Sequence, residues 1–205
     1  MSLIEVLPLA VVMVAGPQII STVVLATSHS WRKNSAAFLL GSLLSITLVV
    51  STSYVIGFNL ISSTQETSST LLLLILLLLL YAMLQTYLKR NVSEPPKWMG
   101  KLQTLKTGSS FKLGFLLLGF FPTNLATNLA VGSYLSAQGD PLINSAGFIF
   151  LTLLFLGTPA TALILYGEKA EKKLPEVRKW MNQNSWIINE LVLTVFILIT
   201  LNNIT

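Results

Sequence analysis

The chain has 205 residues, of which 53% are hydrophobic and only 10% are charged, whereas soluble domains carry roughly 25% charged residues. This composition excludes an ordinary soluble domain and predicts an integral membrane protein. The chain has no cysteine and a single histidine, His29. These counts exclude disulfides, thiol redox chemistry and metal sites built from thiolates or from several histidines.

Six apolar segments follow one another along the chain, and each is close to the length of about 20 residues that a membrane-spanning helix needs. They are residues 6–27, 36–58, 71–88, 113–137, 146–166 and 186–204. The runs lack the alternation of a β-barrel, and a bilayer admits only helices or closed barrels. The sequence therefore predicts an all-α integral membrane protein with six transmembrane helices, forming a single transmembrane domain over residues 1–205.

The charges of the connecting segments predict the orientation. Every lysine and arginine lies in the first, third or fifth connection, whereas the second and fourth contain only the acids Glu66 and Asp140. Basic connections stay cytoplasmic, so we expect a multi-pass protein of the cell (plasma) membrane with both termini outside. The basic residues are Arg32 and Lys33, then Lys89, Arg90, Lys97, Lys101, Lys106 and Lys112, then Lys169, Lys172, Lys173, Arg178 and Lys179.

The net charge of +5 is therefore a topology signal. A nucleic-acid partner is not expected, because the lysines are not interleaved with the base-stacking aromatic residues that such a surface needs. The fifth connection, residues 168–186, has Leu174, Val177 and Met181 on one helical face and Trp180 beside them. This pattern predicts an amphipathic helix at the membrane interface.

The two halves of the chain share a pattern. Aligning Pro17 with Pro122 also aligns Thr22 with Thr127, and the next segment of each half contains GSLLS from Gly41 or GTPAT from Gly157. With three helices in each half, the second half is inverted relative to the first. The prediction is two inverted three-helix repeats, about 1–90 and about 111–205, joined by a cytoplasmic connection at about 89–112.

Each repeat carries a proline near the middle of its first helix. A proline removes one backbone hydrogen bond and frees the carbonyl four residues before it, here those of Met13 and Leu118. Polar residues gather around both breaks, and at such a depth they face the bundle interior or a water-filled cavity. The predicted substrate-binding site comprises Pro17, Gln18, Ser21, Thr22, Pro122, Thr123, Asn124, Asn128, Thr158 and Pro159.

Within this site, we expect Asn124 and Gln18 to contact the polar part of the substrate. The alternative is that these side chains only hold helices together by interhelical hydrogen bonds. Glu190, inside the last predicted span, is a candidate for coupling transport to an ion; its alternative role is to reach the membrane interface. No metal site, cofactor or catalytic residue is expected.

Several short motifs follow one another along nearly the whole chain. They are Pro17-x-Ile19-Ile20, Arg32-x-Asn34, Ala37-Phe38-Leu39-Leu40-Gly41, Pro96-x-Trp98-Met99, Pro122-x-Asn124-Leu125, Pro159, Gly167-Glu168-Lys169-Ala170, Trp180 and Asn184. In order and spacing this set resembles the LysE superfamily of six-helix exporters, and within it the GAP-like branch of glycopeptidolipid- and sulfolipid-addressing proteins. The resemblance implies a small membrane protein linked to the delivery of lipid-anchored glycans to the cell surface.

The function predicted from these observations is an exporter or flippase-like transporter of an amphiphilic or lipid-linked substrate. Its expected partners are membrane lipids and that substrate. A homo-oligomer is an alternative to a single chain. One alternative is an exporter of a small polar solute, such as an amino acid or an ion. Another is a scaffold that holds a lipid-assembly complex together without transporting anything. A polar cavity at the two breaks favours transport, and tightly packed breaks favour the scaffold.

Overall fold

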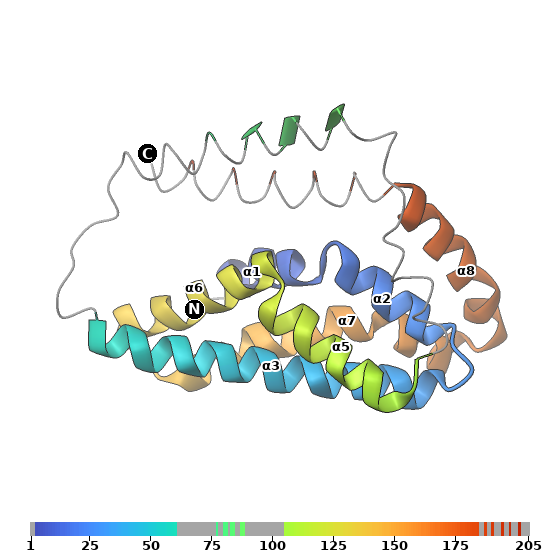
Figure 1. Cartoon of the computed structure of the whole chain (residues 1–205), viewed down its shortest axis with the longest axis horizontal. Helices are drawn as coiled ribbons and strands as arrows, with labels where there is room; N and C mark the ends of the chain where they lie inside the picture. The colour runs from blue at the N-terminus through green and yellow to red at the C-terminus, as the bar shows by residue number, and fades with distance from the viewer. Residues whose placement is uncertain are drawn as a thin grey trace.

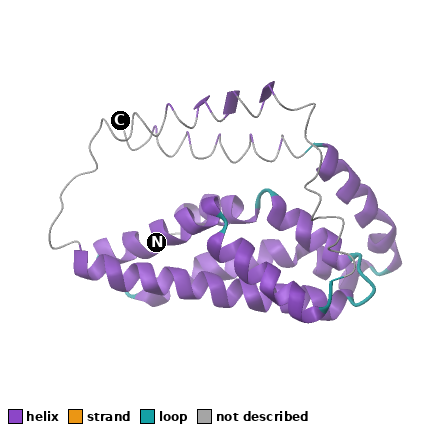
Figure 2. Cartoon of the chain, viewed as in Figure 1, coloured by secondary structure: helices purple, strands orange, loops and turns teal. Residues whose placement is uncertain are grey.

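The computed structural model describes residues 3–60 and 105–184, together with the single residues 77, 80, 81, 83, 84, 87, 88, 187, 190, 194, 197 and 201. In this described part the chain forms helices, turns and short loops without a β-strand, which confirms the all-α prediction (Figure 2). The predicted spans 71–88 and 186–204 lie mostly outside the described residues, as do Glu66 and the connection 89–104.

The first predicted span is broken where the sequence predicts a break. Helix α1 covers Leu3–Val14 and helix α2 covers Pro17–Ala26. Between them, Gly16 has φ 96° and ψ −142°, a conformation that only glycine adopts without strain. Pro17 takes the first position of α2, where its missing N–H costs no helix hydrogen bond.

The fourth predicted span is broken in the same way. Helix α5 covers Thr107–Phe120 and helix α6 covers Pro122–Ala137, and the two meet at a bend of 62°. Phe121 between them is extended, with φ −64° and ψ 133°, as the residue before a proline prefers. Both predicted proline breaks are therefore confirmed.

The remaining long helices are unbroken. Helix α3 covers Trp31–Leu60, and helix α7 covers Ala146–Tyr166 after a 3₁₀ turn at Leu142–Ser145. By length and composition, α3 and α7 with its preceding turn can each cross a membrane, and the bent pair α5–α6 counts as a third crossing if taken as one span. Helix α8, Glu168–Gln183, follows at the amphipathic segment of the sequence.

The broken helices pack against the unbroken ones of the opposite half (Figure 1). Helix α3 lies along both α5 and α6, and α1 and α2 both lie against α7. The broken helices also touch each other crosswise, because α1 contacts α6 and α2 contacts α5. Their two breaks are therefore brought to the same region of the bundle.

Helix α3 and the pair α5–α6 run in the same direction. Hydrogen bonds join Asn34 to the carbonyl of Leu105, Ser45 to that of Phe115, and Ser53 to that of Leu129. Residue numbers thus rise together along both elements. The partners are almost in backbone contact, because a Cβ added at Gly41, Gly114 or Gly132 would overlap a backbone carbonyl of the facing helix, as in other close helix pairs of membrane proteins.

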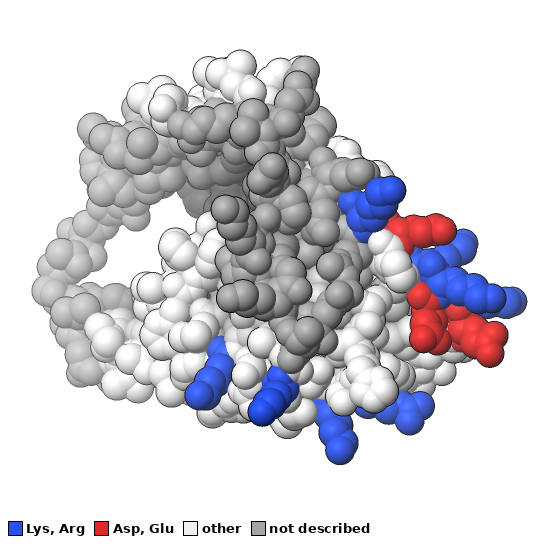
Figure 3. All heavy atoms as spheres, turned by 45° about the vertical axis from the view of Figure 1, so that its right-hand side comes forward, with Lys and Arg blue, Asp and Glu red and all other residues white. Residues whose placement is uncertain are grey.

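One end of the bundle carries the basic residues. The turn between α2 and α3, the start of α5 and the turn between α7 and α8 meet there, and we call it the basic end. Figure 3, turned so that this side comes forward, shows the Lys and Arg side chains gathered on it, with acidic side chains among them. Asp140 lies at the opposite end, between α6 and the 3₁₀ turn.

Candidate functional site

At the second break, two asparagines hold the end of α5. The Asn128 side chain donates from Nδ2 to the carbonyl of Leu118 at 2.8 Å, and Asn124 donates to the carbonyl of Leu117 at 2.9 Å. Leu118 carries the carbonyl that Pro122 frees, so Asn128 replaces the missing backbone donor. Both amides are fully buried, and each keeps an Oδ1 atom without a hydrogen-bond partner in the described structure.

The first break is arranged differently. Gln18 is also fully buried, yet neither its Nε2 nor its Oε1 has a hydrogen-bond partner in the described part of the chain. Its Oε1 lies 3.2 Å from the position that a Cβ on Gly16 would occupy, so the side chain folds back over the break. A buried amide without a partner lowers the stability of the fold by roughly 1–3 kcal/mol. Gln18 is a buried amide with both polar atoms in this state among the described residues.

The hydroxyl groups near the first break are satisfied within their own helix. Ser21 donates to the carbonyl of Pro17 at 2.6 Å, and Thr22 donates to that of Ile19 at 2.8 Å. Both side chains are buried. Their oxygen atoms keep a lone pair for a ligand, but their protons are engaged.

Other predicted site residues lie apart from this buried group. Pro122, Thr123 and Thr158 are exposed on the described bundle, and the Thr158 hydroxyl donates to the carbonyl of Phe155 in its own helix. Pro159 is buried inside α7 without ending that helix. The structure therefore gathers Gln18, Ser21, Thr22, Asn124 and Asn128 in the core and leaves Thr123 and Thr158 at the surface.

The two copies of the small-residue motif differ in surroundings. In GSLLS, Ser42 and Ser45 are buried, and Ser45 donates to the carbonyl of Phe115 on α5 at 2.6 Å. In GTPAT, Thr158 and Thr161 are exposed and bond only within α7. The sequence pattern is repeated, but the packing around it is not.

One buried hydroxyl group is not among the predicted site residues. Thr152 on α7 is fully buried, and its Oγ1 has no hydrogen-bond partner among the described residues. It lies in an apolar stretch without a proline or an amide nearby in sequence. A single threonine in such a stretch gives no signal that separates it from ordinary packing.

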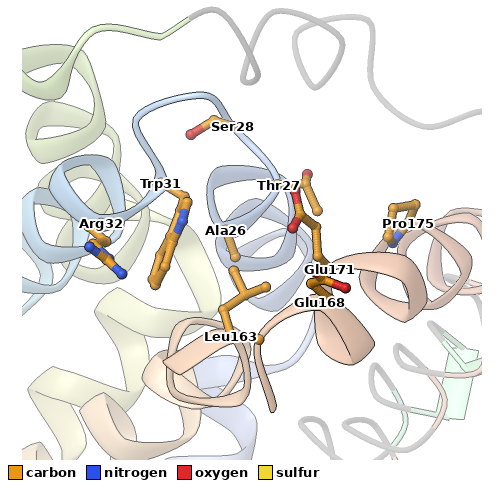
Figure 4. A pocket seen from close by; sticks show the side chains of 10 residues that line it. Ala26, Thr27, Ser28, Trp31, Arg32, Leu163, Glu168, Glu171 and Pro175 are labelled. Atoms are coloured by element: carbon orange, nitrogen blue, oxygen red, sulfur yellow. The ribbon is translucent and has the colours of Figure 1, made fainter. Parts of the chain in front are cut away.

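A second polar region lies at the basic end, where a pocket of 360 Å³ opens between α2, α3, α7 and α8. Figure 4 shows Trp31 and Arg32 on one side and Glu168 and Glu171 on the other. Arg32 stacks on the Trp31 ring, with its guanidinium carbon 5.1 Å from the ring centroid. The pocket thus presents a cation and two carboxylates across a shared space, with Leu163 among its apolar lining.

The α2–α3 turn beside this pocket is fixed by one buried amide. Asn34 donates from Nδ2 to the Ser28 hydroxyl at 3.0 Å and to the carbonyl of Leu105 at 3.2 Å. Arg32-x-Asn34 and Gly167–Ala170 are motifs of the sequence, but they lie outside the predicted substrate site. The turn between α7 and α8 at Gly167, where φ is 48°, places Glu168 at the pocket that Arg32 also lines.

Glu190 is one of a few single helical residues that the structure describes in the segment 186–204. Its carboxylate oxygens have no hydrogen-bond partner in the described part of the chain, and its coupling role stays a prediction. Among the described residues, no three His, Asp or Glu side chains gather as a metal ion would require.

Comparison with known proteins gives one match. The family described as "Sap, sulfolipid-1-addressing protein" matches residues 6–203, which is nearly the whole chain. No curated protein and no solved structure matches the chain.

Proposed function

The chain belongs to the family of sulfolipid-1-addressing proteins, and from this premise we propose that it moves a lipid-linked, amphiphilic substrate outward across the cell membrane. In this proposal it acts as an exporter or flippase-like transporter of the LysE superfamily type. The family description supports a lipid-related role, and the apolar helices α3 and α7 support a membrane location.

The observation that carries the proposal is Gln18 at the first helix break, a buried side chain whose amide has no partner in the described part of the chain. Broken helices at matching places in two repeats mark the substrate sites of many transporters, because the free helix ends offer backbone groups to a ligand. At the second break, Asn124 and Asn128 use their Nδ2 donors on backbone carbonyls and keep only their Oδ1 atoms without a partner, whereas both polar atoms of Gln18 lack a partner among the described residues. A side-chain amide both donates and accepts, which suits the hydroxyl groups of an uncharged glycan.

The packing supports the proposed six spans and inverted repeats. Since α3 and α5–α6 run in the same direction, the chain between them has to cross the membrane once more if both span it. The crosswise contacts of α1 with α6 and α2 with α5 are those expected of two antiparallel broken helices. The proposed orientation puts the basic end in the cytoplasm.

A small zwitterionic solute is the second candidate, favoured by the pocket at the basic end. Arg32 on one wall suits a carboxylate, and Glu168 with Glu171 on the other suits an ammonium group. A scaffold role without transport is favoured by the tight closure of the second break. Gln18 neither lines that pocket nor takes part in the hydrogen bonds at the second break, and its amide has no partner among the described residues.

The proposal is tested first in a strain that lacks the gene. Surface-extractable glycolipids are compared with total cell glycolipids in the deletion strain and in the strain complemented with the wild-type chain. We expect one glycolipid to leave the surface fraction and accumulate inside the cell. An unchanged surface fraction would contradict lipid export, and an altered amino-acid efflux instead would favour the small solute.

The site is then tested by two substitutions that each replace a buried amide by leucine, in the complemented strain and in the purified protein. Gln18→Leu should lower the surface glycolipid about tenfold, the factor expected when a hydrogen bond of ~1.4 kcal/mol is lost, and should leave the melting temperature unchanged or higher. Asn124→Leu should lower the melting temperature, because Asn124 holds the carbonyl of Leu117. A fully active Gln18→Leu protein would refute the assignment of Gln18 to the site.

A further inference from the structure

Helix α8 sorts its side chains into three faces. Glu168, Glu171 and Pro175 face the pocket at the basic end, and Ala170 and Leu174 are buried against α2 and α7. The third face lines a separate groove between α7 and α8. With 100° between successive residues of a helix, the residues that face the pocket fall in one sector of α8, and the three lysines that line the groove fall in the next, together with Glu176.

This groove has the shape and chemistry of a site for an amphiphile. Its volume is 680 Å³, within the range of about 300–1,000 Å³ that is usual for small-molecule sites. Its residues change from apolar on α7 to basic on α8. They are Ala162, Tyr166, Lys169, Ala170, Lys172, Lys173, Leu174, Glu176 and Val177.

The groove lies at the level where lipid headgroups are expected. Tyr166 is the last residue of α7, a helix apolar enough to cross the membrane, and tyrosine is enriched at the boundary between lipid and water. The lysines begin just after the turn at Gly167. An acyl chain can therefore lie along α7 while its headgroup reaches the lysines of α8.

We propose that this groove binds an anionic phospholipid as a resident lipid, with its phosphate on Lys172 and Lys173 and one acyl chain along Ala162 and Tyr166. Three lysines against Glu176 give the groove a net positive charge, so an anionic headgroup is favoured over a zwitterionic one. The proposal does not depend on lipid export, since a scaffold would need the same anchor.

The basic residues of a cytoplasmic membrane face attract anionic lipids in general, so the groove needs a matched control. Lys106 and Lys112 lie at the same end, are exposed, and belong neither to this groove nor to the pocket beside it. Neutralising them removes the same charge as neutralising Lys172 and Lys173. Only the second pair contacts the proposed lipid.

The test is native mass spectrometry of the purified full-length protein titrated with phosphatidylglycerol or phosphatidylcholine. For the wild type we expect tighter binding of the first phosphatidylglycerol than of the first phosphatidylcholine. The double variant Lys172→Gln/Lys173→Gln should weaken phosphatidylglycerol binding about tenfold or more. Lys106→Gln/Lys112→Gln should stay within about twofold of the wild type.

Three results would overturn the proposal. The first is a wild type that binds phosphatidylglycerol no more tightly than phosphatidylcholine, and the second is an equal loss of phosphatidylglycerol binding in both double variants. The third is a wild-type dimer that becomes a monomer in the groove variant, since the groove would then be occupied by a second copy of the chain. If the groove variant does not fold, Val177→Asp gives a second test. This exposed residue lines the groove, and a carboxylate there should repel the phosphate and weaken binding in the same way.

Discussion

Leu118 illustrates how a proline break inside a membrane protein is kept from costing stability. Pro122 takes away the donor that the Leu118 carbonyl would have in a continuous helix, and no water is at hand in the bilayer core to replace it. Asn128, ten residues further on, supplies the donor instead. At the first break, Gln18 has no hydrogen-bond partner among the described residues. In the function proposed here, the second break is therefore structural and the first one binds the substrate.

This division predicts the effect of Asn128→Leu on stability. The substitution keeps the number and branching of the side-chain heavy atoms but leaves the Leu118 carbonyl buried without its donor Asn128, which should destabilise the protein by about 1–3 kcal/mol. Thermal unfolding in detergent measures the change. Thr123→Val on the same helix is the control, since that side chain is exposed and its substitution should stay within about 0.5 kcal/mol. Equal melting temperatures for the two variants would contradict the capping role of Asn128.

At the level of single residues, the sequence predicted the breaks but not their partners. The effects of Pro17 and Pro122 follow from the chemistry of proline alone, and so does the freed carbonyl of Leu118. Which amide reaches that carbonyl depends on the 62° bend between α5 and α6, and no local pattern encodes that bend. The pocket with Arg32 and Glu168 was missed for the same reason, because it depends on two turns far apart in the chain.

Among the helices, the two copies of the small-residue motif show how a repeat can diverge in packing. Gly41 lets the backbone of α3 approach the carbonyl of Phe111 on α5 so closely that no Cβ fits between them. Gly157 occupies the matching place on α7, yet the nearest atom to its added Cβ is a methyl carbon of Leu39 at 3.8 Å. The packing around Gly41 is thus tighter than that around Gly157, whose nearest neighbour, Leu39, also belongs to α3.

The pair Gly41→Ala and Gly157→Ala measures this difference. Gly41→Ala must push α3 away from α5 and should cost about 1–3 kcal/mol, as overpacking usually does. Gly157→Ala should be neutral or stabilise by up to about 1 kcal/mol, because alanine favours a helix over glycine. The melting temperatures of the two purified variants are compared with that of the wild type, and only Gly41→Ala should lower it. If Gly157→Ala were the more harmful change, the contrast in packing would be wrong.

For the molecule as a whole, the directions of the helices agree with the charge pattern of the connections. The described lysines and arginines gather at one end of the bundle (Figure 3), and α3 and α5 both begin there. A chain that alternates across the membrane with basic connections on one side gives this arrangement. The sequence predicts this alternation from charge alone, and the gathering of the described basic residues at one end agrees with it.

Accessibility in intact cells tests the proposed orientation. Gln138→Cys, at the end of α6 opposite the basic end, should react with a membrane-impermeant maleimide. Lys106→Cys, at the start of α5, should react only after the membrane is opened. The native chain has no cysteine, so no background label interferes. Labelling of Lys106→Cys in sealed cells would reverse the proposed orientation.

The seam between α3 and α5–α6 also sets an order of events at the ribosome. Helix α3 is synthesised well before residues 107–137 emerge. Until then, the backbone of α3 at Gly41 lacks the α5 backbone that packs against it. The first half therefore cannot complete its packing as an independent unit. Folding is completed only when the second half is present. A chain truncated before residue 107 would leave this face of α3 exposed, and we expect it to be degraded faster than the full chain.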